Sequence, residues 1–167
     1  KLDYLLLDLP PGTGDIPLTL SQKVHVTGAV IVTTPQEVAL QDVYKSVSMC
    51  AKVGIPVLGV VENQSWFVCD SCDTRHEIFG KGGGTKVATL ASAPLLGQIP
   101  IDKACREAGD SGVPIVVGAP DSPSGRALAA VADQLAARIA VHHAERGARV
   151  IALERPGSSQ KHLPVLR

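Results

Sequence analysis

Short apolar runs alternate along this chain with longer segments whose apolar residues recur at helical spacing. The short runs predict strands because they are continuous, mainly apolar and bounded by Gly, Pro or Asp; they are Tyr4–Asp8, Gly28–Thr34, Val57–Val61 and Leu95–Ile99. The longer segments predict helices over 16–24, 37–53, 85–90, 103–108 and 124–143. This alternation predicts an α/β fold, doubly wound, with a mostly parallel sheet and helices on both faces.

The ends of the predicted elements follow from a few residues. Gly54 stands at the stop position of helix 37–53, and Ile115–Val117 is expected to be no more than a short edge element. After Ala144 the helical periodicity is lost, so we expect one domain over 1–144 and a poorly ordered tail over 145–167. Because Lys1 stands just before a strand that reads as buried, we expect the chain to begin inside a domain.

Residues 62–84 interrupt the alternation and form the longest predicted irregular connection within that domain. This segment carries the single Trp, a Cys pair and a run of glycines. Long irregular insertions in compact folds are usually functional. The insertion is therefore the first place to look for chemistry.

Composition excludes several classes of protein. The 167 residues hold 16 basic and 16 acidic residues, so charge draws the chain neither to nucleic acid nor to anionic lipid. No segment approaches the roughly 20 apolar residues that span a bilayer. Four unevenly spaced cysteines do not resemble a secreted disulfide framework. We expect a cytoplasmic protein with an aliphatic core.

The strand Tyr4–Asp8 and the turn after it are a candidate nucleotide site. A carboxylate fixed at the end of a buried strand can serve Mg²⁺, and a following glycine lets a backbone N–H approach a terminal phosphate. The segment reads Asp8-Leu-Pro-Pro-Gly-Thr-Gly-Asp15, with Gly12 in the turn.

Cys69-Asp-Ser-Cys72 is a candidate metal or cluster site. Two thiolates at this spacing can point at one metal, and two chains meeting at a two-fold axis would supply the four that an iron–sulfur cluster or Zn²⁺ takes. A thioredoxin-like redox pair fits less well, because no helix start follows the pair. His76 is a conceivable further ligand, and Cys50 and Cys105 read as buried apolar residues.

Several motifs together resemble the Mrp-type iron–sulfur cluster carrier ATPases, relatives of the MinD and ParA ATPases. The resemblance spans roughly residues 3 to 140 and preserves the order of the motifs. Besides the Asp8–Asp15 segment and the Cys pair, these are Thr33-Thr-Pro-Gln36, Gly59-Val-Val-Glu-Asn-Gln-Ser65, Ile78-Phe-Gly-Lys-Gly-Gly83 and Leu96-Gly-Gln-Ile-Pro100.

The resemblance implies a role for each matching residue. Asp8 would hold Mg²⁺ through water and Gly12 would lie near the γ-phosphate of ATP. Asn63 would bind the adenine edge, with Pro100 and Asp102 along the base. The nucleotide role of Asn63 competes with that of a strand-end turn residue, and Asp102 also suits the N-cap of the next helix.

The resemblance also implies the cargo and the partners. Cys69 and Cys72 would bind a [4Fe-4S] cluster across a homodimer and deliver it to apo iron–sulfur proteins, alongside cluster assembly factors. The cluster type does not follow from the residues, because [2Fe-2S] fits the same thiolates.

Two features depart from the family pattern. The family's glycine-rich phosphate loop with two lysines does not occur in these 167 residues, and Gly80–Val87 is no substitute because Thr85 and Val87 replace its Gly and Ser/Thr. We therefore expect this chain by itself to bind ATP weakly and to hydrolyse none. Gln64 stands where Met is usual, with a minor expected effect. Two other readings stay open: a MinD/ParA-like switch with structural zinc, and a non-catalytic fragment.

Overall fold

The computed structural model describes residues 2–9, 15–69 and 71–153 of the chain. In chain order the elements are α1 (Asp15–Lys23), β1 (Ala29–Thr33), α2 (Glu37–Lys52), β2 (Val57–Glu62), β3 (Phe67–Val68), β4 (Arg75–His76), α3 (Gly83–Ala91), β5 (Leu95–Gln98), α4 (Lys103–Ser111), α5 (Ile115–Gly118) and α6 (Pro123–Leu153).

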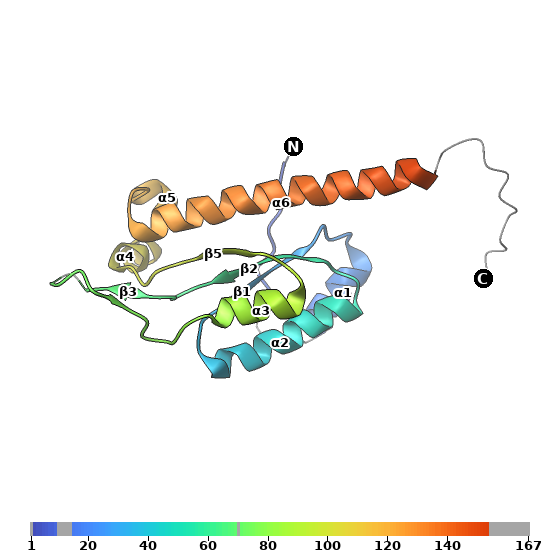
Figure 1. The fold of residues 1–167 in the computed structure, drawn as a ribbon. Helices are drawn as coiled ribbons and strands as arrows, with labels where there is room; N and C mark the ends of the chain where they lie inside the picture. The colour runs from blue at the N-terminus through green and yellow to red at the C-terminus, as the bar shows by residue number, and fades with distance from the viewer. Residues whose placement is uncertain (1, 10–14, 70, 154–167) are drawn as a thin grey trace, which may run out of the picture.

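A parallel sheet in the strand order β1-β2-β5 is the centre of the fold. Its register pairs Val30 with Gly59, and Val61 with Gly97. Helices α2 and α3 cover one face of the sheet and α6 lies across the other (Figure 1). The strands β3 and β4 form a separate antiparallel hairpin that projects beyond the sheet (Figure 1). The prediction of an α/β fold with a mostly parallel sheet and helices on both faces is confirmed.

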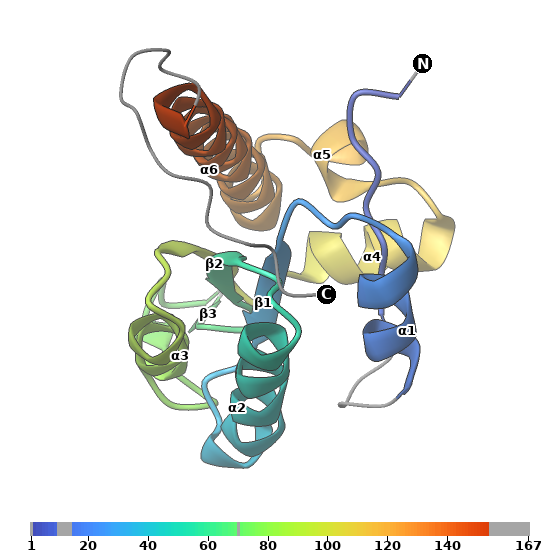
Figure 2. The same cartoon turned by 90° about the vertical axis from the view of Figure 1, so that its right-hand side faces the viewer.

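The core has one apolar layer on each face of the sheet. On the α2/α3 side the buried cluster is Ile31, Leu40, Val47, Cys50, Val60, Val87 and Ala88. On the α6 side the cluster is Val61, Leu96 and Ile99, with Leu128, Val131 and Leu135 of the predicted helical stripe packed against it. Alternate residues of a strand face opposite sides, so β2 contributes to both layers and must be apolar along most of its length. In Figure 2, α6 lies on one side of the sheet and α2 and α3 lie on the other.

Most predicted element boundaries agree with the structure. Helix α2 ends at Lys52 and Gly54 follows with φ +71°, the left-handed conformation that favours glycine after a helix. The two-stranded hairpin lies inside the predicted insertion 62–84. Helix α6 continues past the expected end near His143 to Leu153, and residues 154–167 of the predicted tail lie outside the described residues.

The edge element expected at Ile115–Val117 is instead the short helix α5. The amides of Val117 and Gly118 both donate to the carbonyl of Pro114, at 2.8 and 2.9 Å. Proline is well suited to precede a helical turn, because its own missing N–H is not needed there. The β-branched composition is outweighed by these local hydrogen bonds, and 115–117 pairs with none of the described strands.

The strand expected at Tyr4–Asp8 is wrong. Residues 2–9 form neither helix nor strand in the structure, and the side chains of Tyr4, Leu5, Leu6 and Leu7 are exposed. A strand is held by hydrogen bonds to a neighbouring strand, and within the described residues none pairs with this segment.

The helices differ in length and in polarity. Within the described ranges, none of them is both long and apolar enough to cross a bilayer.

Candidate functional site

The carboxyl ends of β2 and β5 bring the predicted site residues into one region. Beyond the strands the chain segments 62–66 and 98–102 continue side by side. The amide of Ser65 donates to Ile99 O at 3.0 Å, and the amide of Ile101 donates to Trp66 O at 2.7 Å. Ligands of open α/β sheets bind at this carboxyl edge. The backbone therefore places Asn63, Pro100 and Asp102 beside the first residues of the β3–β4 hairpin.

Asn63 is a half-buried residue directly after β2. Its amide donates to Thr33 O at 2.7 Å, which continues the β1–β2 pairing by one step. Its Oδ1 accepts a hydrogen bond from the amide of Gln64 at 2.9 Å, and Gln64 has φ +54°. The structure thus gives Asn63 a local turn role, and the adenine contact stays a prediction.

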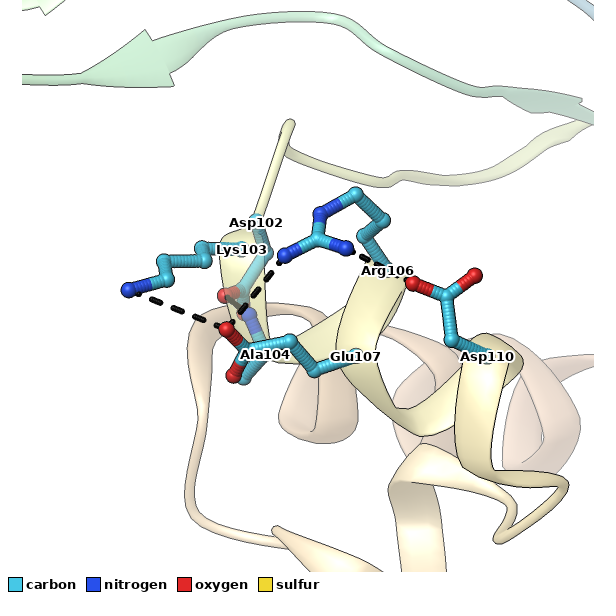
Figure 3. Close-up of polar contacts among 6 residues, drawn as sticks. All are labelled: Asp102, Lys103, Ala104, Arg106, Glu107 and Asp110. Atoms are coloured by element: carbon cyan, nitrogen blue, oxygen red, sulfur yellow. Dashed lines mark hydrogen bonds and ion pairs between the residues drawn. The ribbon is translucent and has the colours of Figure 1, made fainter.

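Asp102 caps two helices at once. Its Oδ1 accepts from the amide of Ala104 at 2.9 Å, at the start of α4, as Figure 3 shows. Its Oδ2 accepts from the amide of Ser124 at 3.1 Å, at the start of α6. A carboxylate at these positions satisfies amides that lack partners within their own helices. The N-cap interpretation is therefore observed, and contact with a nucleotide base stays a prediction.

Pro100 lies close to the same start of α6. It is buried, and its carbonyl accepts a hydrogen bond from Ser124 Oγ at 3.3 Å. Ser124 is itself fully buried. Ser124, at the start of α6, thus holds both Pro100 and Asp102, the residues predicted to lie along the adenine base.

The cysteine pair lies at the tip of the β3–β4 hairpin. Phe67 pairs with His76 and Val68 with Arg75. The tip is closed by the amide of Cys69 donating to Thr74 O at 3.0 Å and the amide of Asp73 donating to Cys69 O at 2.9 Å. The side chain of Cys72 is exposed and that of Cys69 is half-buried. Both thiols are thus accessible from outside the fold.

The hairpin tip also favours the thiolate form of Cys72. Sγ of Cys72 and Oγ1 of Thr74 lie 3.2 Å apart. Hydrogen bonding to the Thr74 side chain lowers the pKa of Cys72, and the Thr74 backbone and the Cys69 side chain lower it further. The thiolate is the form that ligates a metal.

Further metal ligands do not gather at this tip. Among the described residues, no group of three or more His, Cys, Asp and Glu could hold a metal ion. His76 is exposed on β4, opposite Phe67. Cys50 is buried in the α2 face of the core, as predicted, while Cys105 on α4 is only partly buried. One chain therefore offers two thiolates at this site.

Asp8 and Gly12 are the residues predicted to serve Mg²⁺ and phosphate. Asp8 is exposed on segment 2–9, and no hydrogen bond or ion pair links it to another residue that the structure describes. Gly12 lies outside the described residues. Their nucleotide roles stay predictions.

The glycine run of the insertion forms the start of α3. Gly82 is the N-cap with φ +76°, and the amide of Gly84 donates to the carboxylate of Glu62 at 2.5 Å. A protein carboxylate therefore occupies a position where a phosphate loop would bind its anion. This agrees with the expectation that Gly80–Val87 is not a phosphate loop.

Glu62 is the residue whose importance sequence reasoning missed. It belongs to the motif Gly59–Ser65, in which only Asn63 was expected to have a role. It is 1% exposed, and its Oε1 also accepts from Gln98 Nε2 at 2.7 Å. The signal in the sequence is a carboxylate ending an otherwise apolar strand, because a charged residue is rarely buried without partners.

Comparison with known proteins identifies the family. The family model described as ParA, NUBPL iron-transfer P-loop NTPase, matches residues 1–136. A protein of Synechocystis named iron–sulfur cluster carrier protein is 50% identical over 141 residues, which are 84% of this chain and 40% of that protein. The protein of the same name in Escherichia coli K12 is 49% identical over 138 residues, 83% of this chain and 37% of that protein. The chain thus spans about two fifths of the length of these relatives.

Solved structures agree with the fold. A nucleotide-binding protein from Archaeoglobus fulgidus in complex with ADP has a TM-score of 0.58 at 44% identity, covering 66% of this chain and 46% of that one. The cell division ATPase MinD of Pyrococcus furiosus has a TM-score of 0.62 at 27% identity, covering 80% of this chain and 51% of that one. The order of the motifs, the parallel sheet and the family match lead to one conclusion: this chain belongs to the ParA-type family of iron-transfer P-loop NTPases.

Proposed function

We propose that this chain is the cluster-bearing part of an iron–sulfur cluster carrier. Cys69 and Cys72 would bind a labile [4Fe-4S] cluster together with the same two residues of a second copy, and deliver it to apo-proteins. The observation that carries the proposal is the accessible pair of thiols at the hairpin tip. Relatives that are about half identical to this chain are named iron–sulfur cluster carrier proteins.

The number of ligands supports a site shared by two chains. A [4Fe-4S] cluster takes one thiolate per iron, so about four in all. One hairpin offers two, and a two-fold axis repeats them. Transfer then consists of ligand exchange, in which an incoming thiolate of the acceptor displaces a cysteine thiolate from iron without change in oxidation state. An exposed Cys72 with a lowered pKa suits both the binding and the release of iron.

A nucleotide would regulate this exchange in a longer polypeptide. Asn63, Pro100 and Asp102 would contact the adenine of ATP, while Asp8 would hold Mg²⁺ through water and Gly12 would lie near the γ-phosphate. The first three are supported by their common position at the carboxyl edge of the sheet. We place hydrolysis of ATP, the homodimer, delivery to apo-proteins with assembly factors, and a cytoplasmic location in the same proposal.

Anaerobic reconstitution with iron and sulfide tests the proposal. We expect a broad absorption at about 400 nm, about four iron atoms per two chains, and dimers on size-exclusion chromatography. The double variant Cys69→Ser/Cys72→Ser should lose all three. Cys105→Ser is the matched control, because Cys105 is a partly buried thiol that belongs to α4 and not to the hairpin.

Two results would contradict the proposal. Equal iron binding by the double variant would remove the Cys pair from the site. Tight zinc binding without any cluster would instead favour a MinD/ParA-like switch with a structural metal.

A further inference from the structure

Glu62 is a buried carboxylate that the proposed cluster and nucleotide contacts do not use. The partners of its carboxylate are neutral donors, the amide of Gly84 and the side-chain amide of Gln98. None of the ion pairs formed by the described residues includes it. A buried carboxylate carries a large desolvation cost, which only good hydrogen bonds offset. The places of Gly84 and Gln98 in the fold therefore indicate the role of Glu62.

The two ends of the Cys-bearing insertion both bind to Glu62. Where the chain leaves the sheet, Oγ of the buried Ser65 donates to the backbone carbonyl of Glu62 at 2.9 Å. Where the chain returns, the amide of Gly84 donates to the carboxylate of Glu62 at 2.5 Å. Glu62 at the end of β2 thus contacts both ends of the segment 66–83, whose start is also held by the amide of Ile101 on Trp66 O at 2.7 Å.

The returning end is seated without spare room. A Cβ atom on Gly84 would lie 2.7 Å from Cβ of Glu62, and one on Gly83 would lie 2.8 Å from the backbone Cα of Pro35. Such distances are shorter than real Cβ contacts. The glycines let the turn approach the ends of β1 and β2 closely enough for the carboxylate bond to form.

The middle of the insertion is separated from the sheet by a cavity of about 460 Å³. Its lining includes Glu62, Gln98, Arg75, Glu77 and Lys81. Arg75 packs over the Trp66 ring at 4.0 Å and lies 3.7 Å from Glu77, so these contacts stay within the insertion. With a cavity beneath it, the insertion depends for its direction on the attachments at its base.

We propose that Glu62 is a positioning residue that fixes the direction of the hairpin and thereby presents Cys69 and Cys72 to the second copy. Only the cluster measurement in the test below rests on the proposed function. The carboxylate acts through Gly84 and Gln98 and touches no cluster atom. Both of its oxygens accept hydrogen bonds, so the two attachments need a side chain that presents two acceptors.

The substitution Glu62→Gln tests this with almost no change in volume. A glutamine turns one acceptor oxygen into an NH₂ donor, so with Gln98 oriented as it is here the side chain can no longer accept from both Gly84 and Gln98. Glu77→Gln is the matched control. It removes the same charge from the same cavity, but Glu77 makes its ion pairs within the insertion, with Arg75 and Lys81.

Trp66 is the only tryptophan and reports the base of the hairpin without any cluster. In Glu62→Gln we expect the acrylamide quenching constant of Trp66 to rise at least about two-fold and its anisotropy to fall, with unchanged far-UV circular dichroism. Iron incorporation should fall at least about two-fold. Glu77→Gln should keep the wild-type values of all of these.

Two results decide against the proposal. Wild-type quenching in Glu62→Gln, or equal changes in both variants, would overturn it. If Glu62→Gln does not fold, Gln98→Leu decides by the same Trp66 measurements, because it removes one donor and leaves the charge. If the wild-type chain takes up no cluster, the proposed function fails, while the Trp66 readout still decides the role of Glu62.

Discussion

The carboxylate of Asp102 accepts a hydrogen bond from the backbone amide of Ser124, 22 residues further along the chain, at 3.1 Å. Because its other oxygen caps α4 through Ala104, one side chain joins the starts of two helices. Asp102→Ala should therefore lower the free energy of unfolding by about 2 kcal/mol, the loss expected for one to two caps. Urea denaturation followed by circular dichroism measures this.

A neighbouring aspartate controls for the loss of charge. Asp110 of α4 makes an exposed ion pair with Arg106 at 2.7 Å, visible in Figure 3. Asp110→Ala should cost under about 0.5 kcal/mol, as exposed helical ion pairs do. If both variants lose the same stability, the double cap contributes nothing of its own.

Helix α2 offers a second matched pair of positions. Leu40 is 0% exposed in the core, whereas Val38, two residues earlier, is 80% exposed. Leu40→Ala should destabilise the chain by about 2–5 kcal/mol, because it removes buried methyl groups and leaves a cavity. Val38→Ala should stay within about 0.5 kcal/mol of the parent. Thermal and urea unfolding of the two variants check this, and equal losses would show that α2 does not pack as described.

The Cys72 thiol should react at lower pH than an ordinary thiol. Hydrogen bonding to the Thr74 side chain lowers its pKa, so the thiolate persists to more acidic solution. The rate of alkylation by iodoacetamide, followed residue by residue in mass spectrometry, should titrate at lower pH in the parent than in Thr74→Val. Any stability that this thiolate contributes is present above the unfolded-state pKa and is lost as pH falls through the lower folded-state value.

Cys50 serves as the internal reference in that experiment. Burial raises its pKa, so it should stay unmodified in the folded chain and react only after denaturation. Coincident titration of Cys72 in the parent and in Thr74→Val would remove Thr74 as the cause.

The 167-residue chain by itself should turn over no measurable ATP. Its sequence lacks the glycine-rich loop whose amides and lysines hold the triphosphate, and Asp8 alone cannot position Mg²⁺ and phosphate. Phosphate release should therefore be the same for the chain and for Asp8→Ala. ATP turnover that Asp8→Ala abolishes would contradict this prediction.

Much of the fold follows from local patterns in the sequence. Periodicity located β1, β2, β5 and most helices, because the apolar face of each element is written in residues close together in the chain. Gly54 marked the end of α2 for a local reason as well, since few other residues adopt its φ of +71°. The spacing of Cys69 and Cys72 alone indicated a metal or cluster pair, because two residues separate the thiols along the chain. These are properties that neighbouring residues decide.

The sequence by itself thus determined the class of fold, the family resemblance and the thiol pair. The tertiary structure decided which apolar runs become strands: Tyr4–Asp8 does not, because no described strand pairs with it, and 115–117 turns into a helix after Pro114. It also decided the partners of Glu62, which lie 22 and 36 residues away at Gly84 and Gln98. Strand pairing and the hydrogen bonds of buried charges join distant segments, and no local periodicity records which segments will meet.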